Sequence, residues 1–307
     1  MKKEITLLII AAIIALFSSC STFGGGYDMM EPEEVACYSL ENEELTKDIQ
    51  KDEDMITVSS EVIKLHKQIW ERASTLIPDD YEHFIKHFKI SSDGSEGIMA
   101  FVEPEESEEE YNLDSWTLSV DIADAMDRMG KLKNSDEYGL DQTIIHEFAH
   151  ILSLNSNQAE SVDISSEKPN WIKNWDFHNG YRDADIIFKK DSYLNIFFQK
   201  FWGNDFFQDF IAMNDLPDKQ YAQEMNLFSI KYYNDFVSDY AMTNPDEDFA
   251  ETFRIFVTTD KPDGTTKSQR KALFLYDFPE LIQIREHMRS VLYKDKDRSE
   301  ETATPLS

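Results

Sequence analysis

The chain has 307 residues, of which 60 are acidic and 30 are basic, and its formal net charge at pH 7 is −30. A surface of this sign repels polyanions, which argues against nucleic acid and anionic lipid headgroups as partners. The hydrophobic content of 41% and the chain length are sufficient for one large domain or two small ones.

Residues 1–19 have the pattern of a secretion signal. Lys2 and Lys3 precede an apolar run from Ile5 to Phe17, which is shorter than a comfortable membrane span and typical of a signal-peptide core. We expect this segment to be removed. An uncleaved membrane anchor and an ordinary signal peptide are the alternatives.

Cys20 follows two small residues, Ser18 and Ser19, and this arrangement resembles the cleavage site of bacterial lipoproteins. Phe17 departs from the leucine that such sites usually carry three places before the cysteine. The resemblance implies that Cys20 receives fatty acyl chains such as palmitate, which attach the protein to a membrane. Ser21 stands where inner-membrane retention signals usually have Asp. This favours the outer membrane of a Gram-negative cell, with the protein facing the periplasm or the cell surface.

Residues 20–55 are rich in Gly, Glu and Asp. Such a composition predicts a flexible acidic tether between the anchor and a folded domain. Cys37 lies within this segment. If Cys20 is acylated, Cys37 is the one cysteine left, so an intramolecular disulfide is impossible and we expect a buried or incidental thiol.

The folded domain is expected to span residues 56–295 and to be followed by a disordered tail at 296–307. Apolar residues recur with helical spacing in some segments and alternate in others, which predicts an α+β fold that is mainly helical. Helices are predicted at Ser59–Ile77, 141–154, 183–237, 244–253 and 266–293, and strands at Phe88–Ile90, Ile98–Val102 and Trp116–Val120.

The stretch from Asp141 to Leu154 contains His146-Glu147-Phe148-Ala149-His150, the HExxH pattern of zinc metallohydrolases. Two histidines four positions apart lie on one face of a helix, where both imidazoles can reach one zinc ion. Glu147 can then face the open side of the metal and take a proton from water. The alternative is a surface pair without a metal. The apolar residues of the same helix argue against it, because buried imidazoles need partners.

A catalytic zinc site needs a third protein ligand and an open fourth position. The arrangement HExxHxxGxxH is absent, because Ser153 and Ser156 occupy its Gly and third His positions. Glu160 and Glu167 are loosely placed for another known arrangement, but they lie in a polar stretch typical of a loop. The better candidate is Glu247, which lies much later in the chain.

The segment 244–253 has the local pattern of a helix. Asn244 is a favourable N-cap, and Pro245 suits the first helical position. Glu247 and Glu251 are then one turn apart on one face, while phenylalanines line another face. Glu247 can ligate zinc, and Glu251 can accept the free ring N–H of a ligand histidine. The alternative is that the acidic residues of the first turn only complement the helix dipole.

Together the two segments resemble the gluzincin zinc metallopeptidases, over roughly residues 115–260. The run Tyr240–Phe253 is similar to the zinc-ligand helix of the anthrax lethal factor family. In that family an HExxH helix is followed much later by Glu-x-Phe-Ala-Glu, and a tyrosine precedes the ligand glutamate by seven positions. The site that this resemblance implies has the zinc ligands His146, His150 and Glu247, the catalytic residues Glu147 and Tyr240, and Glu251 beside a ligand histidine.

The chain is also similar to bacterial lipoproteins described as zinc-binding metallopeptidases, some of them associated with substrate import. This resemblance implies a zincin-like fold with a small mixed sheet, a peptide or protein substrate, and a TonB-dependent import system as a candidate partner. In zincins an edge strand precedes the active-site helix and binds extended substrate, and Trp116–Val120 is the candidate. The alternatives are a zinc-containing capture lipoprotein without turnover and a zinc amidase acting on a non-peptide amide. His178 is given no role.

Overall fold

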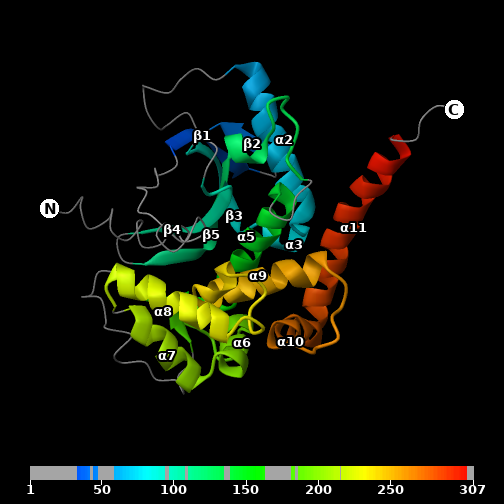
Figure 1. Cartoon of the computed structure of the whole chain (residues 1–307). Coiled ribbons are helices and arrows are strands. Elements are labelled where there is room, and N and C mark those ends of the chain that lie inside the picture. The colour runs from blue at the N-terminus through cyan, green and yellow to red at the C-terminus, as the bar shows by residue number, and fades with distance from the viewer. Residues whose placement is uncertain are drawn as a thin grey trace.

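Figure 1 shows a computed structural model of the chain, which describes residues 33–41, 44–47, 59–93, 97–107, 110–134, 139–162, 181–183, 186–214 and 216–302. The fold is α+β, with a mixed sheet packed against helices. Residues 1–19 and Cys20 lie outside the described residues, so the expectations for a signal segment and for lipidation have no structural counterpart here.

The main sheet has five strands in the order β2-β1-β3-β5-β4. β3 and β5 are parallel and the other neighbouring pairs are antiparallel, so the sheet is mixed. A smaller sheet has the order β6-β8-β7. The strands are β1 (Glu33–Glu41), β2 (Glu44–Lys47), β3 (Ile85–Ser92), β4 (Ala100–Glu106), β5 (Tyr111–Asp121), β6 (Ala159–Ser161), β7 (Arg182–Asp183) and β8 (Ile186–Phe188).

The helix α5 is the link between the sheet and the C-terminal helices, because it contacts the strand β4, the helix α2 and the helix α9 (Figure 1). In the described part of the chain, no helix has the length and apolarity that a membrane crossing requires. The helices are α2 (Ser60–Leu76), α3 (Asp79–Glu82), α4 (Ile122–Ala125), α5 (Leu140–Leu154), α6 (Tyr193–Phe201), α7 (Asn204–Asn214), α8 (Asp218–Lys231), η3 (Tyr240–Met242), α9 (Pro245–Thr258), α10 (Lys267–Phe274), η4 (Leu275–Asp277) and α11 (Pro279–Thr302).

The helix α2 joins the sheet to α5. The ring of Trp70 on α2 lies 5.4 Å from the ring of Phe88 on β3, measured between centroids. On the same helix, Arg72 donates from Nε and Nη2 to the two carboxylate oxygens of Asp141, over 2.6 and 2.5 Å. Two parallel charge-assisted hydrogen bonds fix orientation as well as distance. Asp141 lies in the first turn of α5, so this ion pair fixes that turn against α2.

Residues 33–41 form a strand, so the prediction of a flexible tether over 20–55 is wrong for this part. β1 pairs with β3, and its central residues Ala36, Cys37 and Tyr38 are buried. The apolar run of β1 is short and has acidic residues on both sides, so its composition is typical of a linker. Its partner strand β3 is distant in the sequence, and local composition therefore does not predict the pairing. Cys37 is a free thiol buried in this strand.

Trp116–Val120 is not an edge strand, contrary to the prediction. It lies in β5, which is flanked by β3 and β4, and all residues from Ser115 to Asp121 are buried. The alternation of polar and apolar side chains predicts the strand, which is confirmed, but the edge position was implied only by the zincin resemblance, and both faces of the strand are covered. The edge strand beside α5 is β4, which begins within the predicted strand Ile98–Val102.

The C-terminal helix is longer than predicted. α11 continues to Thr302 and so occupies part of the segment 296–307 that was expected to be a disordered tail. The sequence there is rich in Lys, Arg, Asp and Glu, and such a composition does not exclude a helix. The predicted helix Ser59–Ile77 and the predicted strand Phe88–Ile90 are confirmed as α2 and part of β3.

We predict that Ala36→Asp destabilises the domain, because Ala36 is fully buried in β1 and leaves no room for hydrating a carboxylate. The expected loss of unfolding free energy is at least about 3 kcal/mol, measured by urea denaturation. Glu34→Asp, at an exposed position of the same strand, is the matched control and should cost less than about 0.5 kcal/mol. Equal stability of the two variants would show that β1 does not belong to the core.

Candidate metal centre

The HExxH residues lie on a helix that is buried along nearly its whole length. The apolar residues Ile144, Ile145 and Phe148 are at most 1% exposed, so α5 has no solvated face around the motif. His146, Glu147 and His150 are consequently buried as well, at 3–5% exposure. A buried ionisable side chain is unfavourable unless it is paired. The sequence prediction of a helix over Asp141–Leu154 is confirmed.

The helix α9 begins as its sequence predicts. The Asn244 side chain accepts the backbone N–H of Glu247 over 2.8 Å, and Pro245 occupies the first turn. Phe249, Phe253 and Phe256 are buried, and the ring of Phe253 lies 6.1 Å from that of Phe148 on α5. This apolar contact packs α9 against α5, which crosses it in Figure 1, and the carboxylates of α9 lie toward the histidines.

Three buried ligand atoms converge between α5 and α9. Glu247 Oε2 lies 3.0 Å from His146 Nε2 and 3.5 Å from His150 Nε2, and the two Nε2 atoms are 3.2 Å apart. All three atoms lie within 4.8 Å of one another, so the group can hold a metal ion. The structure therefore brings together the three residues that the sequence singles out as ligands.

The protonation of these atoms explains why the group attracts positive charge, either a proton or a metal ion. His146 Nδ1 lies 3.0 Å from Glu251 Oε1, so the ring proton is held on that side and Nε2 of the neutral ring is an unprotonated acceptor. Glu247 Oε2 is buried and has no hydrogen-bond partner, although the imidazole nitrogens are near. Acceptor atoms that face one another repel unless a proton or a metal ion lies between them.

The acid–base behaviour of the same residues agrees with this need for positive charge. Burial opposes protonation of His146, yet the adjoining carboxylates of Glu247 and Glu251 hold the pKa of its ring well above the usual value. Burial alone would raise the pKa of Glu247, but the imidazoles of His150 and His146 lower it to about 2. A divalent cation would take the place of the proton that the histidines otherwise attract.

Glu251 has hydrogen-bond partners in addition to His146. Ser238 Oγ donates to Glu251 Oε2 over 2.6 Å, and Arg254 donates to both carboxylate oxygens over 2.8 and 2.9 Å. Arg254 also donates to Gln142 Oε1 on α5, over 2.8 Å. These three residues were not predicted from the sequence. The position of Arg254, three after Glu251, is a spacing at which helical charges pair and is the one signal that was available.

Glu147 is tied to the sheet. Its Oε2 accepts the backbone N–H of Val102 on the edge strand β4, over 3.1 Å. Burial raises the pKa of Glu147 to about 7, while the positive charge that His146 and His150 carry when protonated favours the ionised carboxylate. A carboxyl group that titrates near neutrality can both accept and return a proton.

Tyr240 lies beside the same group. It starts the short helix η3, and its half-buried ring lies 5.6 Å from the His146 ring between centroids, with the two planes inclined by 34°. The aromatic contact places Tyr240 next to a candidate ligand without making it a ligand.

Other candidates do not join the group. Glu160 lies in β6, and Glu167 and His178 are outside the described residues. A second set of neighbouring carboxylates, Asp93, Asp121 and Asp124, has a structural explanation, because Asp121 accepts backbone N–H groups at the start of α4.

Comparison of the chain with protein-family models, with curated proteins and with solved structures finds no match.

We predict that Glu247→Ala abolishes tight binding of a divalent metal, whereas Glu251→Ala weakens it by about 10–100-fold. The first variant loses a ligand atom, and the second loses the partner of the His146 ring N–H. Competition with a chromophoric chelator measures both affinities, and Glu160→Ala is the carboxylate control outside the group. If the severities were reversed, Glu251 would be the ligand.

Proposed function

We propose that this protein is a zinc metallopeptidase of the gluzincin type, with a zincin-like fold, that hydrolyses peptide bonds. The observation that carries the proposal is the convergence of three buried ligand atoms with a fourth ionisable residue, Glu147, on the adjoining helical position. A purely structural metal site has no need of a buried carboxylate beside its ligands. A catalytic site requires one as a base.

The residues fit zinc. Two imidazole nitrogens and one carboxylate oxygen form a donor set that catalytic zinc sites use, and it leaves a fourth position for water or substrate. Glu247 Oε2, buried without a hydrogen bond, is the kind of atom that such an ion would satisfy. When bound, zinc supplies Lewis acidity, which polarises a substrate carbonyl and makes water a stronger acid.

The residues of the chain would divide the proton transfers among them. Glu147 takes a proton from water at a carboxylate oxygen and returns it to the nitrogen of the leaving amine. The Val102 N–H holds Glu147 Oε2, so the carboxyl group is oriented before substrate arrives. Glu251 fixes the ring orientation of His146. Tyr240 donates a hydrogen bond to the oxygen on which negative charge develops.

The edge strand β4 suits an extended peptide. It is the last strand of the sheet, with β5 as its strand neighbour, and it contacts α5. A substrate that adds to such an edge makes backbone hydrogen bonds whatever its side chains are. Because Val102 of this strand contacts Glu147, a peptide aligned along β4 would bring its backbone to the base.

We further propose that the protein is a lipoprotein acylated at Cys20 and attached to the outer membrane of a Gram-negative cell, where a TonB-dependent import system is a candidate partner. The support is the apolar run and the small residues before Cys20. Mass spectrometry of the native protein tests it, since acylation predicts a diacylglyceryl adduct on a chain that begins at Cys20.

We predict that Glu147→Gln retains zinc but loses peptide hydrolysis by at least about 10²-fold, because Glu147 is a base and not a ligand. Elemental analysis and cleavage of a broad peptide library, applied to wild type and variant together, measure both properties. Zinc without cleavage in either protein would favour the capture lipoprotein, and turnover of non-peptide amides alone would favour the amidase. Cleavage at the wild-type rate by Glu147→Gln would show that Glu147 is not the base.

We predict that Tyr240→Phe lowers kcat by roughly 10²–10³-fold and leaves zinc affinity unchanged, because it removes a hydrogen-bond donor and keeps the ring on His146. Steady-state kinetics on the best library peptide provides the measurement. Tyr293→Phe, at an exposed position of α11, is the matched control and should retain full activity. An unaltered kcat in Tyr240→Phe would show that the Tyr240 hydroxyl does not donate to the oxyanion.

A further inference from the structure

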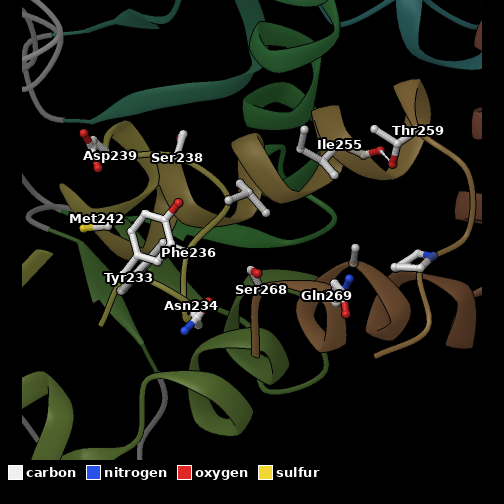
Figure 2. Close-up of a pocket in the computed structure, with 13 residues that line it drawn as sticks. Tyr233, Asn234, Phe236, Ser238, Asp239, Met242, Ile255, Thr259, Ser268 and Gln269 are labelled. Carbon is white, nitrogen blue, oxygen red and sulfur yellow. Dashed lines mark hydrogen bonds between the residues drawn. The ribbon is translucent and has the colours of Figure 1, made fainter. Parts of the chain in front are cut away.

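A cavity separate from the metal centre lies on the side of α9 that faces α10. Its volume is about 420 Å³, and its walls come from the segment Tyr233–Met242, from α9 and from α10 (Figure 2). This volume falls within the range of pockets that bind small organic molecules. Figure 2 shows Asp239 at one end of the cavity and Thr259 toward the other. None of its lining residues is one of the three metal-ligand candidates.

The lining has an apolar floor and one charge. Phe236, Met242 and Ala272 are buried beneath the cavity, and Ile255 adds a further aliphatic wall. Among the lining residues that the structure describes, Asp239 alone has a formal charge, and none of them is a cation that could neutralise it. Tyr233 also lines the cavity and is 74% exposed, which leaves an aromatic face available to a cation. In a chain of net charge −30, the surrounding field adds to the attraction of positive ligands.

One wall residue connects the cavity to the metal centre. Ser238 lines the cavity, and its hydroxyl donates to Glu251 Oε2 over 2.6 Å and accepts the backbone N–H of Ala241 over 3.1 Å. Glu251 in turn faces His146 Nδ1 over 3.0 Å. The wall of the cavity is therefore two hydrogen bonds away from a candidate metal ligand. A displacement of Ser238 would change how Glu251 holds the histidine ring.

We propose that this cavity binds a small organic cation with an aromatic or aliphatic body, and that its occupancy is coupled through Ser238 to the metal affinity of the His146–His150–Glu247 site. The coupling rests on the zinc binding of the proposed function, but not on peptide hydrolysis. Thermodynamic linkage makes the effect reciprocal, so zinc must change the affinity of the cation by the same factor by which the cation changes the affinity of zinc.

Isothermal titration calorimetry of the full chain with benzamidine, in zinc-loaded and zinc-free forms, tests both parts. Benzoate is the matched anionic probe. We expect benzamidine to bind and benzoate not to bind. We expect Asp239→Asn to weaken benzamidine binding about five-fold or more. Asp277→Asn, an exposed aspartate outside the cavity, should leave the affinity as in wild type. Equal binding of the two probes, or an unchanged affinity in Asp239→Asn, would overturn the site.

The coupling has its own readout. Zinc should change the Kd of benzamidine by about five-fold or more. Ser238→Ala should remove this difference, and Ser238→Thr, which keeps a hydroxyl, should restore it; circular dichroism verifies that both variants fold. A chain that binds zinc but shows equal benzamidine affinity in the two forms would overturn the coupling alone. A wild-type chain that binds no zinc would overturn the coupling together with the proposed function.

Discussion

Where α5 packs on α9, ionisable side chains are buried together, and the balance of charge among them governs what the centre can do. Three carboxylates, those of Glu147, Glu247 and Glu251, meet one guanidinium, that of Arg254. With the carboxylates ionised and the imidazoles neutral, the group carries a net charge of −2, which one divalent cation cancels. A buried group of this composition that bound no cation would have to take up protons instead, and the raised pKa of His146 reflects that demand.

The same centre is held in position from three directions. Arg72 secures the first turn of α5, Arg254 joins Gln142 on that helix to Glu251 on α9, and the backbone of β4 reaches Glu147. None of these three hydrogen bonds involves a candidate metal ligand. They would support the candidate ligands in the arrangement that a bound ion needs.

Local pattern predicts the helices of the site because their signals are short-range. The spacing of His146 and His150 and the capping of α9 by Asn244 are each contained in a few consecutive residues. The contact between the two helices has no such short-range signal, because Glu251 is 105 residues from His146. Only the presence of both motifs in one chain predicts that the helices meet.

The order of the strands lies beyond local pattern for the same reason. The zincin resemblance placed Trp116–Val120 at an edge, but β3 and β4 pair with β5 on its two sides. The acidic residues around β1 make its sequence resemble a linker, and only its pairing with β3 identifies it as a strand. Ser238 and Arg254 likewise gain their importance only through Glu251, since neither belongs to a motif.

The distance along the chain between the two ligand helices has a consequence for folding. An ion bound by His150 and Glu247 would join two helices that are separated by nearly a hundred residues in the chain, and in the unfolded chain these ligands are too far apart to hold it together. The described part of the chain contains no disulfide that could serve this purpose, and Cys37 is a free thiol. Because the ion would bind the folded chain in preference to the unfolded one, the free energy of binding would become free energy of folding. The supply of metal would then determine how much folded protein accumulates, in addition to whether the folded protein is active.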